Sequence, residues 1–248
     1  MKIYAVGLGP GNPDYLAPKA REAILASDVV AGYTGYLEFI PDLLKNKEII
    51  ATGMKGETKR CEAAIAGALK GKQVCVVSSG DAGIYGMAAL LYELAERHEA
   101  IEIEVIPGIT AASSAAAILG SPLTNDFAVI SLSDLLTPWD VIEKKLDACS
   151  MADMVLCLYN PQSKKRSDYL ERACAIILWH KSPETNCGYV QNALRGGGAS
   201  GWGGCKSCIC TLAELAKTPV DMFTTVVIGN SDTKIINGKL VTVRGYRL

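Results

Sequence analysis

QVCVVSSGDAGIYG, residues 73–86, is the stretch that decides the predicted fold. Its first part, Gln73–Val77, is an apolar and β-branched run, typical of a parallel strand that is covered on both faces. Its second part, Ser78–Gly86, is rich in glycine and small residues and follows the strand directly. Ligands of open α/β sheets gather at the carboxyl ends of such strands. The sequence therefore predicts a ligand-binding loop at Ser78–Gly86.

Working outward from this stretch, short apolar strands alternate with amphipathic helices along the chain. Strands are predicted at 3–6, 29–31, 49–50, 73–77, 101–106, 127–132, 154–159, 186–190, 224–228 and 241–244. Helices are predicted, from apolar residues at helical spacing, at 18–26, 57–69, 87–97, 138–148, 165–178 and 211–216. This alternation indicates an α/β fold with mostly parallel sheets. The small-residue stretch 107–120 is the predicted boundary between two lobes.

The composition excludes several classes of protein. The chain has 248 residues, of which 49% are hydrophobic, enough for one large domain or two small ones. Its 25 Lys and Arg nearly balance its 26 Asp and Glu, so no surface for nucleic acid or an anionic membrane is predicted. No run approaches the ~18 apolar residues of a membrane-spanning helix, and the N-terminal sequence lacks the apolar run of a signal peptide. We therefore expect a soluble, cytoplasmic protein.

Nine cysteines and two histidines bear on metal binding. Cys75 and Cys157 lie in apolar strands, where a reduced thiol behaves as a small hydrophobe, as expected in a reducing compartment. With so few histidines, a His-based metal site or a Ser/His/Asp triad is poorly supplied. The glycine-rich stretch 195–210 is predicted to be a mobile, irregular loop. Its Cys205, Cys208 and Cys210 leave a zinc or iron–sulfur site open, but a fourth ligand is missing, and we predict no metal.

The loop Gly7–Pro13 follows the first predicted strand and superficially matches a dinucleotide-binding fingerprint. Pro10 removes an amide donor, Asn12 interrupts the glycine spacing, and the next helix begins only near Pro18. A pyrophosphate would therefore not meet a helix N-terminus, which makes a nicotinamide-dependent oxidoreductase the weaker alternative. The glycines serve either a tight turn or a loop whose bare backbone lets a large ligand approach. We prefer the last interpretation.

Two further loops carry residues suited to a ligand. In Ser78–Gly86, free amides suit a carboxylate and Asp81 can accept from an ammonium or hydroxyl group, the two needs of an amino-acid-like ligand. Alternatively, Asp81 caps the following helix and Tyr85 serves packing. In Pro107–Ala117, small side chains would let a helix N-terminus press against a flat ligand, or would simply allow close helix packing.

Taken together, Gly7–Pro13, Gly80–Gly86 and Thr110–Ala112 resemble the tetrapyrrole methyltransferase family. The resemblance implies the two-lobed tetrapyrrole methylase fold of class III S-adenosylmethionine methyltransferases, in which each lobe is a mostly parallel sheet flanked by helices. It implies lobes of residues 1–112 and 113–248 with the cofactor cleft between them, and a homodimer. The expected cofactor is S-adenosyl-L-methionine, with S-adenosyl-L-homocysteine as the product.

Four more segments resemble one branch of this family: FAVISLSDLLTPW (127–139), LYNP (158–161), VIGNS (227–231) and RGY (244–246). That branch methylates ring carbon 17 of precorrin-3B or cobalt-factor III in cobalamin biosynthesis. It couples methylation to corrin ring contraction, in which carbon 20 is expelled from the ring and kept as an acetyl group. A methyltransferase of the same fold acting on another ring carbon is the alternative.

The resemblance also implies roles for the matching positions. The implied cofactor-binding residues are Pro10, Gly80, Asp81, Ala82, Ile84, Tyr85, Thr110, Ala111, Tyr159, Asn160, Asn192, Ala193 and Thr225. Methyl transfer depends chiefly on positioning, whereas ring contraction requires proton transfer, for which the candidates are Asp81, Tyr85, Ser131, Ser133 and Asp134. Asp134 alternatively caps the next helix. The basic run Lys164–Arg166 either steers a substrate with many carboxylates or forms a solvated surface.

Overall fold

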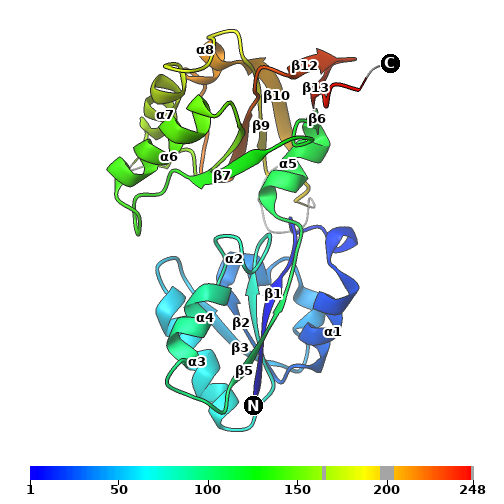
Figure 1. The fold of residues 1–248 in the computed structure, drawn as a ribbon. Coiled ribbons are helices and arrows are strands. Elements are labelled where there is room, and N and C mark those ends of the chain that lie inside the picture. Colours follow the sequence, from blue (N-terminus) through cyan, green and yellow to red (C-terminus); the bar gives the residue numbers. More distant parts are fainter. Residues whose placement is uncertain (164–165, 196–203, 247–248) are drawn as a thin grey trace. The chain divides into compact units, whose positions relative to one another are not determined.

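The computed structural model describes residues 1–163, 166–195 and 204–246, which form two compact units (Figure 1). Unit 1 contains residues 1–111 together with Leu194 and Arg195, and unit 2 contains residues 112–193 and 204–246. The sequence predicts one division of the chain, near Ala112. In the structure, Leu194 and Arg195 also belong to unit 1. No helix in the described ranges is long and apolar enough to cross a membrane.

Unit 1 is a parallel five-stranded sheet with helices on both faces, as the sequence predicts (Figure 1). Its strand order is β3-β2-β4-β1-β5, with β1 (Lys2–Gly7), β2 (Val29–Tyr33), β3 (Glu48–Thr52), β4 (Val74–Ser78) and β5 (Glu102–Ile106). Its helices are α1 (Pro18–Ala26), α2 (Thr34–Leu37), α3 (Glu57–Leu69) and α4 (Ala88–Ala95), with short 3-10 turns at Pro13–Tyr15 and Pro41–Leu43. The chain leaves β1 toward β2 but leaves β4 toward β5, on the opposite side. Such a reversal opens a ligand-binding crevice at the carboxyl ends of the strands.

Strand β4 contacts the cores on both faces of this sheet. Val74 and Val76 pack into the core that α3 and α4 cover, whereas Cys75 and Val77 pack into the core that α1 covers. All five residues of β4 are buried, which is why its sequence is apolar throughout. Burial raises the pKa of the Cys75 thiol, so this cysteine stays protonated and acts as an apolar core residue. The cysteines are all free thiols, as expected.

Unit 2 contains a second five-stranded sheet, of order β10-β9-β11-β8-β7. Its strands are β7 (Phe127–Ser131), β8 (Val155–Tyr159), β9 (Asn186–Gln191), β10 (Lys206–Thr211) and β11 (Thr224–Ile228). A small sheet, β12-β13-β6, adds β6 (Gly120–Ser121), β12 (Thr233–Ile236) and β13 (Lys239–Thr242). Helices α6 (Trp139–Met151), α7 (Tyr169–Ile177) and α8 (Leu212–Leu215) pack against one face of the larger sheet, and α5 (Ala111–Leu119) packs against the other. The α/β class is confirmed in this unit as well.

The strand directions of unit 2 differ from the expected mostly parallel sheet. In the described part of the larger sheet, β7 and β8 are the one parallel pair of neighbours, whereas β11 is antiparallel to both β8 and β9, and β10 is antiparallel to β9. The reason is that the chain returns from β9 along its edge as β10, and strands that follow such a return run in the opposite direction. Apolar periodicity locates a strand but does not encode its direction.

The prediction of an irregular loop over 195–210 is wrong for its last part. Lys206–Thr211 forms β10, in register with β9, and places Cys210 opposite Cys187. Residues 196–203 lie outside the described residues. Cys205 and Cys208 are exposed while Cys210 packs against the core, so the three thiols face different surroundings. Among the residues that the structure describes, no group of three Cys, His, Asp or Glu side chains has metal-binding geometry.

A buried ion pair holds three segments of unit 2 together beyond its core. The Lys181 side chain is 3% exposed, and its Nζ lies 2.8 Å from Oδ1 of Asp153. The Ser231 hydroxyl donates to the other carboxylate oxygen at 2.6 Å. Burial acts to raise the pKa of Asp153, but hydrogen bonds from Lys181 and Ser231 outweigh it and hold that pKa below its ordinary value of 3.8.

Lys181→Met is expected to lower the free energy of unfolding by about 1–2 kcal/mol near neutral pH. The full cost of breaking a buried pair is larger, but Asp153 is 45% exposed and water partly compensates for the lost cation. Because the folded-state pKa of Asp153 is lowered, the pair contributes above pH 3.8 and its contribution is lost as the pH falls through the folded-state value. Urea titrations from pH 3 to 7 should therefore show the difference from wild type shrinking in acid.

The matched control is Lys72→Met, which removes an exposed ion pair with Glu48. It should change the stability by less than about 0.5 kcal/mol at neutral pH. Equal effects of the two substitutions would contradict the structural role of Lys181.

Candidate functional site

Three glycines bring the loops of unit 1 into direct backbone contact at the carboxyl ends of β1, β4 and β5. Gly9 and Gly80 exchange backbone hydrogen bonds of 3.0 and 2.8 Å. A Cβ atom on Gly108 would lie 2.2 Å from the Gly80 carbonyl oxygen, and one on Gly7 would lie 2.6 Å from the Gly108 nitrogen. No side chain fits at such distances. Gly7, Gly80 and Gly108 therefore form a contact, here called the glycine junction, that fixes the three loops relative to one another.

The Asp81 carboxylate ties the same loops together. Its Oδ1 accepts from the backbone N–H groups of Gly83 at 2.7 Å and Ile84 at 3.1 Å. Its Oδ2 accepts from the N–H of Gly108 at 2.9 Å. The sequence left open whether Asp81 caps the next helix, and it instead caps the turn at Gly83, since α4 begins only at Ala88. Both oxygens are engaged, and a further lone pair remains for a ligand donor.

Beyond Asp81 the loop turns outward. Ala82 is buried, whereas Ile84 is 41% and Tyr85 is 61% exposed. Gly86 closes the loop so tightly that a Cβ there would lie 2.3 Å from the Ala82 carbonyl oxygen. Of the remaining predicted residues of unit 1, Thr110 lies beside Gly80, Ala111 is the first residue of α5, and Pro10 lies in the turn after β1. The structure thus gathers the predicted residues of unit 1 at one edge of its sheet.

Left-handed backbone conformations mark several of the predicted positions. Tyr85 has φ +54°, Asn160 has φ +51° and Asn192 has φ +53°. Each residue follows the end of a strand, β4, β8 or β9 respectively. Non-glycine residues adopt this conformation at a cost of order 1 kcal/mol, and they cluster at functional sites.

In unit 2, the predicted residues lie at the carboxyl ends of β8 and β9 and at the adjoining start of β11. The Tyr159 hydroxyl accepts from the N–H of Ala112, at the start of α5, at 2.7 Å. The Asn160 side chain donates to the Ser131 hydroxyl at 3.0 Å. Asn192 and Thr225 are buried, and Ala193, which follows Asn192, is half-buried.

A second polar cluster follows β7. Asp134 accepts from the Tyr169 hydroxyl at 2.7 Å and lies 3.5 Å from the Arg166 guanidinium, which also donates to Ser133 at 2.6 Å. The hydrogen bond that Tyr169 donates to Asp134 lowers the pKa of Asp134 and raises the pKa of Tyr169. Asp134 is therefore ionised at neutral pH, so it can accept a proton but has none to donate.

Two sequence alternatives for this region are wrong. Asp134 does not cap α6, because the residue before that helix is Pro138 and no side chain caps it. Arg166 does not belong to a solvated surface, because its side chain is 15% exposed and bonded within the cluster. Lys164 and Lys165 lie outside the described residues. Sequence reasoning missed Tyr169, which lies 35 positions from Asp134 and carries no motif.

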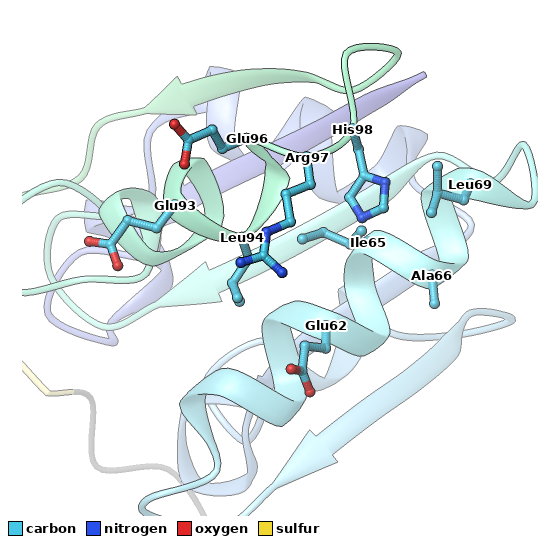
Figure 2. Close-up of a pocket in the computed structure, with 9 residues that line it drawn as sticks. All are labelled: Glu62, Ile65, Ala66, Leu69, Glu93, Leu94, Glu96, Arg97 and His98. Carbon is cyan, nitrogen blue, oxygen red and sulfur yellow. The ribbon is translucent and has the colours of Figure 1, made fainter.

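A surface groove of about 410 Å³ lies elsewhere in unit 1 (Figure 2). Arg97 and His98 extend from the end of α4 toward Ile65 and Ala66 of α3. Leu69 of this groove precedes β4 and His98 precedes β5, so the groove lies toward the amino ends of the strands. It is therefore separate from the glycine junction.

The fold and site together define a class: a two-unit α/β protein whose candidate ligand-binding residues lie mostly in loops at the carboxyl ends of strands. The sequence model of the tetrapyrrole (corrin/porphyrin) methylases matches residues 2–216. The chain belongs to this family. The resemblance found in its loops is thereby confirmed.

Individual relatives are similar over almost the whole chain. The chain is 43% identical to the probable cobalt-factor III C(17)-methyltransferase of Salmonella typhimurium, over 99% of this chain and 100% of that protein. It is 42% identical to the cobalt-factor III methyltransferase of Priestia megaterium, over 99% of this chain but 45% of that protein. The crystal structure of the methyltransferase CobJ superposes with a TM-score of 0.88 at 31% identity, over 97% of this chain and 99% of that one. The chain thus spans less than half of the Priestia relative.

Gly108→Ala is expected to lower the free energy of unfolding by at least about 2 kcal/mol, because the new methyl group collides with peptide groups that cannot move independently. Urea denaturation measures the change. Gly67→Ala is the matched control: its methyl group would meet Val74 at an ordinary 3.5 Å inside α3, so it should stabilise by about 0.5–1 kcal/mol. A Gly108→Ala protein as stable as wild type would contradict the glycine junction.

Proposed function

We propose that this chain transfers a methyl group from S-adenosyl-L-methionine to ring carbon 17 of cobalt-factor III or precorrin-3B and couples the transfer to corrin ring contraction in cobalamin biosynthesis. The observation that carries the proposal is the 43% identity to the Salmonella cobalt-factor III C(17)-methyltransferase over the full length of both chains. The 31% identity to the methyltransferase CobJ, with closely similar structure, supports it.

We assign cofactor binding to the loops at the strand ends of both units. In unit 1, the loop after Gly80 suits the methionine part of the cofactor, because Ile84 and Tyr85 are exposed there. The Asp81 carboxylate retains a lone pair that can accept a hydrogen bond from the ammonium group of the methionine part. In unit 2, Tyr159, Asn160 and Asn192 offer an aromatic ring and amides of the kind that bind an adenosine. Pro10, Ala82, Thr110, Ala111, Ala193 and Thr225 complete the proposed set.

The task of these residues is chiefly positioning. Methyl transfer is an in-line displacement at the sulfonium methyl group, and an electron-rich ring carbon needs no strong base to attack it. A preorganised site holds both reactants near ~3–3.5 Å and excludes water. The glycine junction and the Asp81 hydrogen bonds supply such preorganisation in unit 1.

Ring contraction additionally needs proton transfer, and the side chains differ in what they offer. Asp134 is ionised and can accept a proton. Tyr85 presents a hydroxyl at an exposed position. Ser131 is held by Asn160, and Ser133 by Arg166. We propose Asp134 as the proton acceptor, with Asp81, Tyr85 and Ser131 as the other catalytic candidates.

Anaerobic incubation with S-adenosylmethionine tests the proposal, using cobalt-factor III and precorrin-3B in separate reactions. Mass spectrometry should find a product that has gained one methyl group, and its NMR spectrum should show the new methyl on carbon 17 and the acetyl group. Methylation of a different ring carbon would favour another methyltransferase of the same fold. Absence of methyl gain with either substrate would overturn the proposal.

Asp81→Asn is expected to weaken S-adenosylhomocysteine binding by about 10- to 100-fold, because an amide nitrogen replaces one acceptor and faces a backbone N–H donor. Isothermal titration calorimetry measures the change. Asp140→Asn on the exposed surface of α6 is the control and should bind as wild type does. Unchanged affinity in Asp81→Asn would remove Asp81 from the proposed site.

The proposal includes a homodimer, as the family resemblance implied, and a cytoplasmic location, as the composition indicated. Equilibrium sedimentation should then give twice the mass of one chain. A monomer would contradict only this part.

A further inference from the structure

Arg60 is a buried cation without an acidic partner. The residue is 3% exposed and lies on α3. Its Nε donates to the Thr52 hydroxyl at 2.9 Å, a good hydrogen bond. Its other contacts are a long one of 3.5 Å to the Gly53 carbonyl oxygen and one of 3.6 Å to the Met87 sulfur. Within the described ranges no carboxylate lies close enough to form an ion pair with Arg60. Burial lowers the pKa of Arg60, and the charge of Glu57, three residues earlier on α3, only partly opposes that effect.

This arrangement is unusual within the molecule itself. The other buried cation of the described chain, Lys181, is paired with the Asp153 carboxylate at 2.8 Å. A buried charge without a counter-ion destabilises a folded protein in general. Such a cation has one of two roles. Either it forms an ion pair with an anion that binds from outside the chain, or its hydrogen bonds stabilise the fold. These two roles predict different effects of substitution.

The position of Arg60 favours an anion from outside. Thr52 is the last residue of β3, and Met87 directly follows the loop Gly80–Gly86. The guanidinium therefore lies at the ligand-binding edge of the sheet, beside the loop assigned to the cofactor, and not at the amino ends of the strands.

The surroundings of Arg60 suit a flat, anionic molecule. The ring of Tyr36 stacks on that of Phe39, with centroids 6.2 Å apart, and the Arg195 guanidinium lies 5.7 Å from the Phe39 ring. Burial raises the pKa of Tyr36, and the positive charges of Arg195 and Arg60 act against that rise. Arg195 thus lies against this aromatic cluster, and the charge of Arg60 acts on Tyr36 within it.

We propose that Arg60 binds a peripheral carboxylate of the tetrapyrrole substrate. This role rests on the proposed function, which supplies a substrate with many carboxylates. Guanidinium and carboxylate groups form strong, two-pronged hydrogen bonds. The contacts that a carboxylate would replace are the weak ones, to the flexible Met87 thioether and to Gly53, while the bond to Thr52 holds the guanidinium in place. A macrocycle without carboxylates would form no ion pair with Arg60, so this residue would not increase its affinity.

The test compares Arg60→Met and Arg60→Lys with wild type. Arg60→Met should weaken binding of cobalt-factor III 10- to 100-fold and change S-adenosylhomocysteine affinity less than twofold. Its melting temperature should equal or exceed that of wild type, because an unpaired buried charge is removed. Arg60→Lys, which keeps the charge but not the planar fork, should bind the tetrapyrrole with intermediate affinity. Arg97→Met, an equal charge change in the groove of Figure 2, is the matched control and should match wild type in every measurement.

The outcomes separate this inference from the proposed function. Wild type that binds S-adenosylhomocysteine but not cobalt-factor III would overturn the proposed substrate, and the role of Arg60 with it. Tetrapyrrole affinity that is unchanged in Arg60→Met would overturn the role of Arg60 alone. A lower melting temperature with both ligands weakened, in Arg60→Met and Arg60→Lys alike, would make Arg60 a structural brace and overturn the inference.

Discussion

Contact between peptide groups at the carboxyl ends of β1, β4 and β5 is the constraint on which the rest of unit 1 depends. Gly7, Gly80 and Gly108 approach so closely that a methyl group on Gly7 or on Gly108 would force the loops apart. The Asp81 carboxylate then joins the loop after β4 to that after β5 through three backbone donors. Because these contacts are made within the protein itself, they hold the loop edge in place, and little conformational entropy remains to be lost on binding.

The sequence predicted most elements of this fold because their apolar patterns are local. The expected helix at 57–69 and strand at 224–228 coincide with α3 and β11. Two features of unit 2 were beyond such patterns. Strand direction depends on how the chain returns. The sequence of β10, KSCICT, has no long apolar run and is exposed over its first half, so it is the pairing with β9 that orders this strand.

The candidate site divides in the same way. The glycines and Asp81 stand in motifs, so their loops were predictable from the sequence. That Asp81 accepts hydrogen bonds from backbone N–H groups of two loops was not predictable, because it depends on where Gly108 lies in the folded protein. Asp134 and Tyr169 are 35 residues apart, and their hydrogen bond is a product of tertiary structure. Arg60 stands in an ordinary amphipathic helix, where it is expected on the solvated face. Its burial without a carboxylate partner is visible only in three dimensions.

The central claim is that the preformed loop edge of the glycine junction binds the cofactor. Amide hydrogen exchange followed by mass spectrometry, with and without S-adenosylhomocysteine, tests it most directly. The account predicts slower exchange in peptides covering 78–90 and 106–112, and no change in peptides covering 62–69 and 93–98, which line the groove. Protection at the groove, with exchange at 78–90 and 106–112 unaffected, would contradict it.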